Sequence, residues 1–440
     1  HPGIYRYTPK SAYDSLRTVI EGRLSKRATY LEFLQAVVPA LHLLGCGHSG
    51  WFHEKGYMDY RNANTPYLPL DTRYIDGRLL VLDALCPDSL LKPGTEILTV
   101  NGTPMAELKP RMLRHIYADA HSKGAMESSF GQNFRNIYSN FISQPSYFRL
   151  LTRQPNGDTL EVETEGLKRF RMNKYRGKTG VTGWPGNKPL HFEYKSEKVG
   201  YLSVKTFNTG VLKAYQQSHF HAFIDSVFRD LKLNGAEDLV IDLRGNSGGR
   251  TAYSMQLFSY IAKAPFRWMR DAQLVTQKWT VQAAHALSGN PMQGDTLDFQ
   301  RMEGEEGRYD WTTYPFRGIR KLPAHGFEGR VYVLMDEKTM SAGSIFCSMA
   351  NEYGWAKLIG RETGGGYSGA NSGIQWFILP NTQLKFFLAR VKYALAVEKD
   401  DARQGVKPHV RVVPTIPEIL EGKDMELESA LELVKKARGD

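Results

Sequence analysis

The spacing of hydrophobic positions changes along the chain, and it is most regular in the second half. From residue 198 onward, short apolar runs alternate with segments whose apolar residues recur every three or four positions, which predicts strands alternating with helices. This alternation is typical of an α/β layer with parallel strands, in which ligands bind at the carboxyl ends of the strands. The predicted elements are strands 199–207, 238–244, 330–336 and 356–360, helices 214–233, 251–262 and one beginning near 341, a β-hairpin at 376–393 and an amphipathic helix at 424–437.

The first half of the chain has a different pattern. Residues 11–24 and 29–44 have helical spacing, and the second of these segments ends at a Gly-Cys-Gly stretch directly before His48. Residues 65–170 predict a small β-rich module with helical pieces between its strands. The segment 171–190 is rich in Gly, Lys and Arg and predicts a linker. We therefore expect four parts along the chain, at 1–64, 65–170, 171–190 and 191–440.

Composition is that of an ordinary soluble globular protein and points to no special partner. The 440 residues carry a net charge of +11 that is spread along the chain, and no nucleic-acid-binding module is visible. No segment approaches the roughly 18 apolar residues of a membrane span. Cys46, Cys86 and Cys347 lack metal-ligand spacing, and we expect Cys347 to be a buried apolar residue. We expect no metal, no cofactor, no nucleic acid and no integral membrane segment, and the sequence defines no oligomeric state.

Ser341 stands where an apolar strand pattern ends and a helical pattern begins. Ala342, Ile345 and Met349 recur at helical spacing, so Ser341 lies at or just before the first turn of a helix. One interpretation is an N-cap serine, whose hydroxyl accepts a hydrogen bond from a backbone N–H. The other is a nucleophile, because free N–H groups at a helix start stabilise a developing oxyanion. The local sequence leaves both interpretations open.

The loop GNSGG at 245–249 follows another buried strand and precedes a helix. Gly248 and Gly249 let the backbone approach a ligand closely and direct N–H groups at an anion. A phosphate cradle, an oxyanion hole and a tight turn without a ligand all need these glycines, so the loop alone does not choose between them. Neither common phosphate-binding motif is present. Asp242 and Arg244, just before the loop, are also consistent with a simple structural pair.

A serine nucleophile needs a base, either a histidine or a lysine with a lowered pKa. Of the twelve histidines, His48 is distinctive because Gly45, Gly47 and Gly50 surround it, which suits a side chain on a tight loop facing a cleft. A structural role is the alternative for a single histidine in such a loop.

Taken together, these segments resemble the C-terminal-processing and tricorn-core serine peptidases. DLRGNSGG resembles the family's D-x-R-x-N-x-G-G loop, and TMSAGS resembles its T-x-S-A nucleophile loop. GVKPHVRVVPT and the closing helix resemble two later family elements, and KPGTEILTVNGTPM resembles the signature of the PDZ-like domain that precedes the catalytic core. Five such elements in the family's order cover most of residues 75–437. The resemblance implies an α/β fold with a ClpP/crotonase-like catalytic core, an N-terminal helical segment and a PDZ-like module.

The resemblance also implies roles for particular residues. Ser341 matches the nucleophile, and the N–H of Ala342 with a glycine of the pair Gly248/Gly249 matches the oxyanion hole. One branch of the family takes its base from a lysine about 25 residues after the serine, but no lysine occurs between residues 357 and 385 of this chain. The tricorn-like branch takes a histidine from a glycine-containing loop before the PDZ-like region, which here implies His48.

A third catalytic carboxylate is expected shortly before the GVKP element. Glu398, Asp400 and Asp401 all lie there, and the sequence does not choose among them. The chain departs from the tricorn enzyme at Ala342, where that enzyme has an acidic residue.

The implied activity is peptide-bond hydrolysis through an acyl-enzyme, acting on peptide or protein carboxyl-terminal regions. A PDZ-like module would bind such a peptide as an added strand, or its helical insert would act as a lid. Two alternatives share the fold: an inactive peptide-binding pseudo-protease, and an apolar-ligand-binding protein like the photoreceptor retinoid-binding proteins. By analogy with bacterial members we expect a periplasmic, cell-envelope or secreted location. A chain that starts at His1 rather than Met is consistent with removal of a leader or with an arbitrary starting point.

Overall fold

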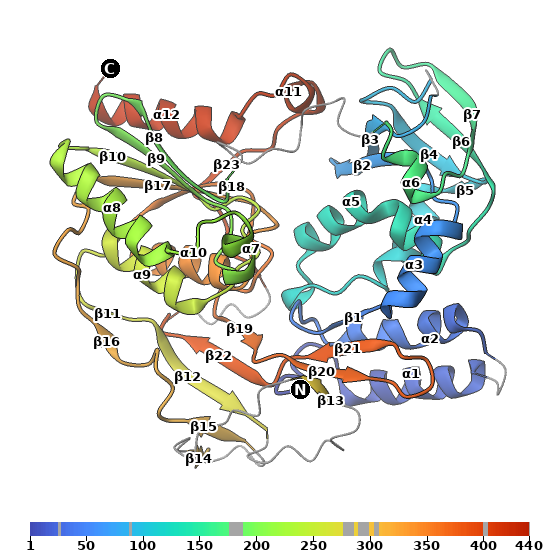
Figure 1. Ribbon diagram of the computed structural model, residues 1–440, viewed down its shortest axis with the longest axis horizontal. Coiled ribbons are helices and arrows are strands. Elements are labelled where there is room, and N and C mark those ends of the chain that lie inside the picture. The colour runs from blue at the N-terminus through green and yellow to red at the C-terminus, as the bar shows by residue number, and fades with distance from the viewer. Residues whose placement is uncertain are drawn as a thin grey trace.

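The structure is a computed structural model that describes residues 1–24, 28–87, 90–175, 188–275, 286–288, 299–302, 308–398 and 404–439. Two halves lie side by side in Figure 1: an α/β core on the left and a β-rich module on the right. The N-terminal helices and a small sheet lie beneath the module and reach toward the core. Of the predicted linker 171–190, residues 176–187 lie outside the described residues.

The α/β core is built on a sheet of mainly parallel strands, as the alternating pattern predicted. Neighbouring strands from β9 to β23 pair in parallel, and β8 adds an antiparallel edge. Because both faces of a parallel sheet are covered, its central strands are fully buried, as the apolar run at 238–242 indicated. Within the described residues the strand order is β23 (Val410–Arg411), β18 (Lys357–Gly360), β17 (Arg330–Met335), β10 (Asp238–Asp242), β9 (Val199–Val204), β8 (Leu190–Ser196).

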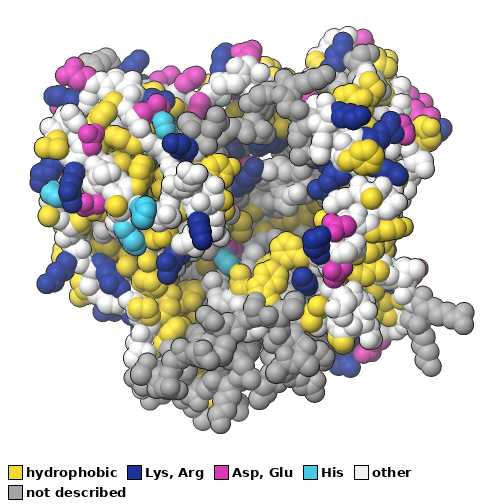
Figure 2. Space-filling model, in the orientation of Figure 1, with side chains coloured by type: hydrophobic (Ala, Val, Ile, Leu, Met, Phe, Trp, Pro, Cys, Tyr) yellow, Lys and Arg dark blue, Asp and Glu magenta, His cyan; other side chains and the backbone are white. Residues whose placement is uncertain are grey.

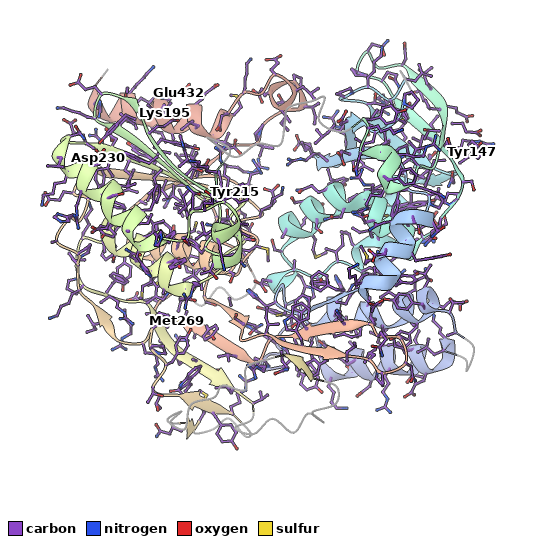
Figure 3. The ribbon with its side chains drawn as sticks, viewed as in Figure 1. Tyr147, Lys195, Tyr215, Asp230, Met269 and Glu432 are labelled. Carbon is purple, nitrogen blue, oxygen red and sulfur yellow. The ribbon has the colours of Figure 1, made fainter. Side chains whose placement is uncertain are left out.

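Helices cover both faces of this sheet. Along β10, Leu239 and Ile241 face one hydrophobic core, whereas Val240 between them faces a second one. The larger core packs against α8 (Phe220–Leu233), α9 (Thr251–Ile261) and α10 (Ala342–Glu352), and the smaller against α12 (Met425–Arg438). Figure 3 shows Lys195 of β8 and Glu432 of α12 on the same upper side of the core. The prediction of one helix over 214–233 is wrong at its start, because Gln216 has a φ of 57° and separates α7 (Thr209–Ala214) from α8.

The β-rich module, here called the β-module, has its own hydrophobic core. Its antiparallel sheet has the order β2 (Leu70–Ile75), β3 (Arg78–Ala84), β4 (Glu96–Val100), β6 (Tyr147–Arg153), β7 (Thr159–Glu165), and β5 (Thr103–Pro104) pairs with β4. The predicted helical pieces are α4 (Met105–Leu113), the 3-10 turn η1 (Asp119–His121) and α5 (Lys123–Phe141). Tyr147 of β6 lies on the outer side of the module in Figure 3.

Helix α5 covers the outer edge of β2, which is one of the two edges of this sheet. An added Cβ on Gly131 would lie 2.2 Å from the backbone nitrogen of Tyr74, so only glycine permits this close packing. The Gly131 carbonyl accepts a hydrogen bond from the Thr72 hydroxyl at 2.5 Å, and Arg135 donates to the Leu70 carbonyl at 2.8 Å. The edge is therefore occupied by the module's own helix. Of the two edge strands, β7 remains exposed along most of its length.

The remaining elements connect the two halves. Helices α1 (Lys10–Arg23) and α2 (Tyr30–Leu43) match the predicted pair, and a capping box between Thr29 and Glu32 begins α2. The predicted hairpin is formed by β20 (Gln375–Ile378) and β21 (Lys385–Leu388), and β1 (Gly50–Phe52) pairs with β21. This small sheet links the segment after His48 to the carboxyl-terminal part of the chain. Further elements are α3 (Lys55–Asn64), β13 (Ala286–Ser288), α6 (Arg169–Met172), α11 (Ile416–Leu420), the pair β11 (Phe266–Arg267) and β16 (Ile319–Arg320), and a sheet of β14 (Phe299–Arg301), β15 (Tyr309–Trp311), β12 (Met269–Leu274), β22 (Val391–Leu395) and β19 (Gly369–Ser372).

Candidate active site

Two loops at the carboxyl ends of β10 and β17 are fixed against each other. Asp336, which follows β17, accepts a hydrogen bond from the backbone N–H of Gly245 at 2.8 Å. The buried Thr339 hydroxyl donates to the Leu243 carbonyl at 2.9 Å, and the Met340 N–H donates to the Asn246 carbonyl at 2.9 Å. These bonds hold the residue before Ser341 against the glycine loop.

Ser341 is the residue before the first turn of α10, and its backbone is strained. Its φ of 53° and ψ of −125° lie in a region that non-glycine residues rarely adopt, at a cost of about 1–3 kcal/mol. No side-chain hydrogen bond from Ser341 caps the helix. The hydroxyl therefore does not perform the N-cap role that the sequence left open, and this strained strand-to-helix turn resembles a nucleophile elbow in geometry although the G-x-S-x-G motif is absent.

His48 reaches Ser341 from the other half of the molecule. Its Nε2 lies 2.9 Å from the Ser341 Oγ, and the histidine side chain is 13% exposed. The loop that carries His48, residues 45–50, is here called the histidine loop. It packs tightly, since an added Cβ on Gly47 would lie 2.7 Å from the Met340 Cε and one on Gly50 would lie 2.3 Å from the Tyr117 hydroxyl. The two residues that the sequence singled out, 293 positions apart, are thus in hydrogen-bond contact. Figure 2 shows a hollow between the halves whose floor carries hydrophobic side chains and a histidine.

The glycine loop lies directly beside the serine. An added Cβ on Gly248 would lie 2.6 Å from the Ser341 Cβ and 2.9 Å from the Ala342 nitrogen, and the φ of Gly248 is +95°. Gly249, with φ of +139°, packs against the Phe207 backbone. The Ala342 N–H is at the start of α10 and has no acceptor within the helix. The Gly248 N–H donates to the Asn246 Oδ1 at 2.8 Å, so in this state it is directed within its own loop.

The predicted carboxylates and the histidine are not brought together among the described residues. Glu398 is exposed, and its backbone N–H donates to Glu352 at the carboxyl-terminal end of α10. Because α10 has eleven residues and a helix rises about 1.5 Å per residue, the end of α10 that holds the Glu398 backbone is roughly 15 Å from Ser341. Asp400 and Asp401 lie outside the described residues.

The structure instead places Asp119 behind His48. Asp119 Oδ2 is 3.8 Å from His48 Nδ1, and the aspartate side chain is 7% exposed. Sequence reasoning did not find Asp119, because it lies in the β-module between helical pieces and nothing in its neighbours signals a site. The segment around residue 119 meets the histidine loop around residue 47 only in the folded chain.

A buried network of charges supports the glycine loop from below. Asp242 is fully buried and accepts hydrogen bonds or ion pairs from Tyr201, Lys205 and Arg244. Burial would raise the pKa of Asp242, but the Arg244 and Lys205 charges hold it below its ordinary value. Arg244 also pairs with Asp424 at the start of α12. The simple structural pairing of Asp242 with Arg244 is therefore confirmed, and it ties the loop to the carboxyl-terminal helix.

The three cysteines are buried and are not joined in disulfides among the described residues, and Cys347 lies in the core as expected. Among the described residues, no group of three or more His, Cys, Asp or Glu side chains has the geometry of a metal site. In the same part of the chain, no helix has both the length and the apolar character that crossing a membrane requires.

The Ser341 loop, the glycine loop at 245–249 and the parallel sheet all lie in the part of the chain that matches a peptidase family model. Residues 198–412 match the family model described as Peptidase family S41. The match spans β9 to β23 and includes Ser341 and both loops. It does not include His48 or Asp119.

Comparison with individual proteins agrees with this fold. The chain is similar to the structure of mature CPAF complexed with lactacystin, with a TM-score of 0.61 and 19% identity over 98% of this chain and 94% of that one. It is also 22% identical over 307 residues to a protein of Chlamydia pneumoniae, covering 57% of this chain, and 25% identical over 207 residues to a protein of Chlamydia trachomatis, covering 39%. The matched regions span 48% and 34% of those two relatives, so the chain covers about half of the first and a third of the second.

Proposed function

We propose that this chain is an endopeptidase that cleaves peptide bonds through an acyl-enzyme on Ser341. The observation that carries the proposal is the 2.9 Å contact between His48 Nε2 and Ser341 Oγ. Strain at Ser341 supports it, because strained backbone is found preferentially at functional sites. A serine that served only as a helix cap would use its hydroxyl for the helix, and this one does not.

The chemistry follows from this geometry. His48 Nε2 accepts the hydroxyl proton as Ser341 Oγ attacks the carbonyl carbon of the scissile peptide bond. The tetrahedral intermediate collapses, the peptide C–N bond breaks, and the imidazolium gives its proton to the departing amine. Water then attacks the acyl-enzyme with His48 as base, which releases the carboxylic acid and regenerates Ser341.

The oxyanion that forms in each step needs backbone donors. The Ala342 N–H, unused at the start of α10, is one donor. The second comes from the Gly248/Gly249 loop, which lies against Ser341; if Gly248 serves, it must give up or share its bond to Asn246. Each donor of this kind is worth about 2.7–4 kcal/mol in the transition state.

The test is covalent labelling with a fluorophosphonate probe, which reacts with activated serines. We expect the full chain to be labelled at one site, and labelling to disappear in Ser341→Ala and to become undetectable in His48→Ala. Melting temperatures of the variants verify that they are folded. A folded wild-type protein that remains unlabelled would contradict the proposal and favour the pseudo-protease or the apolar-ligand-binding alternative.

For the substrate, we propose peptides or protein segments near a free carboxyl terminus, as the family resemblance implies. Strand addition at β2 is blocked by α5, so recognition at the β-module requires the exposed edge of β7 or the hollow between the halves. A pair of otherwise identical peptides, one with a free and one with an amidated carboxyl terminus, tests this. We expect the free carboxylate to raise kcat/KM by about tenfold or more, as a charge-assisted contact would. Equal rates would remove carboxyl-terminal recognition and leave the peptidase activity in place.

A further inference from the structure

Two buried polar atoms in the active site face each other without hydrogen-bond partners. His48 Nδ1 and Asp119 Oδ2 are both buried, and neither has a partner. They lie 3.8 Å apart. Nearly all buried polar atoms in folded proteins have a partner, and an unpaired one costs about 1–3 kcal/mol. Two such atoms that are each other's neighbours therefore require an explanation.

The segment that carries Asp119 is held against the histidine loop at two points. The other carboxylate oxygen, Oδ1, accepts a hydrogen bond from the Gly47 N–H at 2.6 Å. The next residue, Ala120, donates its N–H to the Gly45 carbonyl at 2.9 Å. Asp119 is thus bonded to the residue directly before His48, and its free oxygen is left to face the imidazole.

The backbone directly after Asp119 is strained, as backbone at functional sites often is. Ala120 and His121 both have a φ of 54°, in the left-handed region that non-glycine residues rarely occupy. Two consecutive residues of this kind cost on the order of 1–3 kcal/mol each, and the surrounding contacts must supply that energy. A turn that served only to connect α4 with α5 would not need this conformation.

We propose that Asp119 is the positioning residue for His48, a role that rests on the proposed peptidase function. The Asp119 carboxylate accepts the hydrogen bond of the Nδ1–H, which leaves the Nε2 lone pair directed at Ser341 and stabilises the imidazolium when Nε2 takes the hydroxyl proton. The proton moves between Ser341 Oγ, His48 Nε2 and the departing amine. Shortening the 3.8 Å separation to a hydrogen bond needs a shift of about 1 Å, which is usual between a free and an engaged catalytic site.

Among the described residues, Asp119 is the carboxylate that faces His48. The Cys46 thiol lies beside the same loop, and burial, followed by the charge of Asp119, raises its pKa to about 12, so it remains neutral. Glu398, from the predicted carboxylate set, has its backbone at the far end of α10. Assigning the role to Asp119 also means that the β-module, outside the matched family region, supplies part of the catalytic machinery.

The test compares Asp119→Asn with Glu398→Gln in the full chain. Asparagine keeps an oxygen for the Gly47 N–H but presents an amide NH₂ to His48, which cannot accept from Nδ1–H. We expect the rate of fluorophosphonate labelling to fall by about 10²–10⁴-fold in Asp119→Asn, and to stay within about threefold in Glu398→Gln. The melting temperature of Asp119→Asn should change little.

One further measurement separates a positioning role of Asp119 from a purely structural one. Nitrogen-15 NMR of the histidine rings, assigned by difference from His48→Gln, should show the Nδ1–H tautomer of His48 in the wild type and the Nε2–H tautomer in Asp119→Asn. A wild-type labelling rate in Asp119→Asn, or a reduced rate with an unchanged His48 tautomer, would overturn the assignment. An unlabelled wild type would instead contradict the peptidase proposal, and the tautomer comparison would still decide the role of Asp119.

Discussion

The core and the other half of the molecule supply the candidate site in different ways. In the core, the loops after β10 and β17 carry Ser341 and the glycine pair, and several buried hydrogen bonds fix them against each other. In the other half, His48 and Asp119 come from two separate loops joined mainly through Gly47 and Ala120. The proposed nucleophile is therefore held within the core, whereas the proposed base lies on a loop of the other half. Activity in such an arrangement depends on the docking of the halves.

The two halves also bury polar groups differently. Beneath the glycine loop the core buries ionised side chains, with Asp242 paired to Arg244 and Lys205. The other half also buries a charged side chain, Arg61, and in addition holds partly buried imidazoles. Burial, reinforced by the Arg61 charge, lowers the pKa of His53 to about 4, and burial also lowers the pKa of His115 to about 4. The core should therefore tolerate mild acid better than the half that carries His48.

The largest effect should come from removing a group on either side of the junction. If Ser341 and His48 act as one unit, Ser341→Ala, His48→Ala and the double variant should all lose about 10⁶-fold in kcat on a cleaved peptide. The double variant should be no worse than either single one. Additive losses in this mutant cycle would show that the serine and the histidine act independently and that the junction does not assemble the site.

A smaller effect is expected from the glycine loop of the core. Gly248→Ala places a methyl group against the Ser341 Cβ and the Ala342 nitrogen, so kcat should fall by about 10²–10³-fold, as when an oxyanion donor is displaced. Gly245→Ala is the matched control, since Gly245 also has a positive φ, +75°, but an added Cβ there meets no atom within 4 Å. Steady-state kinetics should show little change for the control. Equal losses in both variants would mean that backbone strain, not contact with Ser341, is responsible.

In the β-module the expected effect is on stability. Gly131→Ala forces α5 away from the β2 backbone and should lower the free energy of unfolding by about 1–3 kcal/mol. Gly124→Ala in the same helix meets only the Glu337 Cβ, at an ordinary contact distance of 3.8 Å, and should be neutral or stabilising by up to about 1 kcal/mol. Denaturant titration of both variants measures the difference. If they behave alike, the tight packing of α5 on β2 is not important for stability.

The smallest effect concerns pH. The pKa of His115 is depressed in the folded state, so between about pH 6.5 and 4 the unfolded chain binds a proton that the folded chain does not, and stability falls as the pH falls. Each such histidine contributes at most about 1.4 kcal/mol per pH unit. His115→Phe, which keeps the stacking on Phe141, should make the melting temperature less dependent on pH between 7 and 5. An unchanged pH dependence would show that His115 is accessible to protons in the folded protein.

The core was more predictable from the sequence than the site. The strands at 238–242 and 330–335 and the helix that begins after Ser341 are contiguous patterns whose burial on both faces leaves a clear apolar signature. Glycines and small residues drew attention to Ser341 and His48, but their roles were inferred from the family resemblance. Asp119 was not found, because its 72-residue separation from Gly47 is closed only by tertiary packing. The expected periplasmic, cell-envelope or secreted location stays a prediction.

The seating of α5 on β2 has a consequence for how the β-module meets other chains. Helix α5 belongs to the same chain as β2, so it competes for that edge as an intramolecular ligand. The effective concentration of such a ligand is on the order of millimolar. A soluble peptide would have to outcompete this resident occupant before it could pair with β2. The β2 edge of the module is therefore already occupied by α5. The module instead provides a rigid support for the loop that holds Asp119.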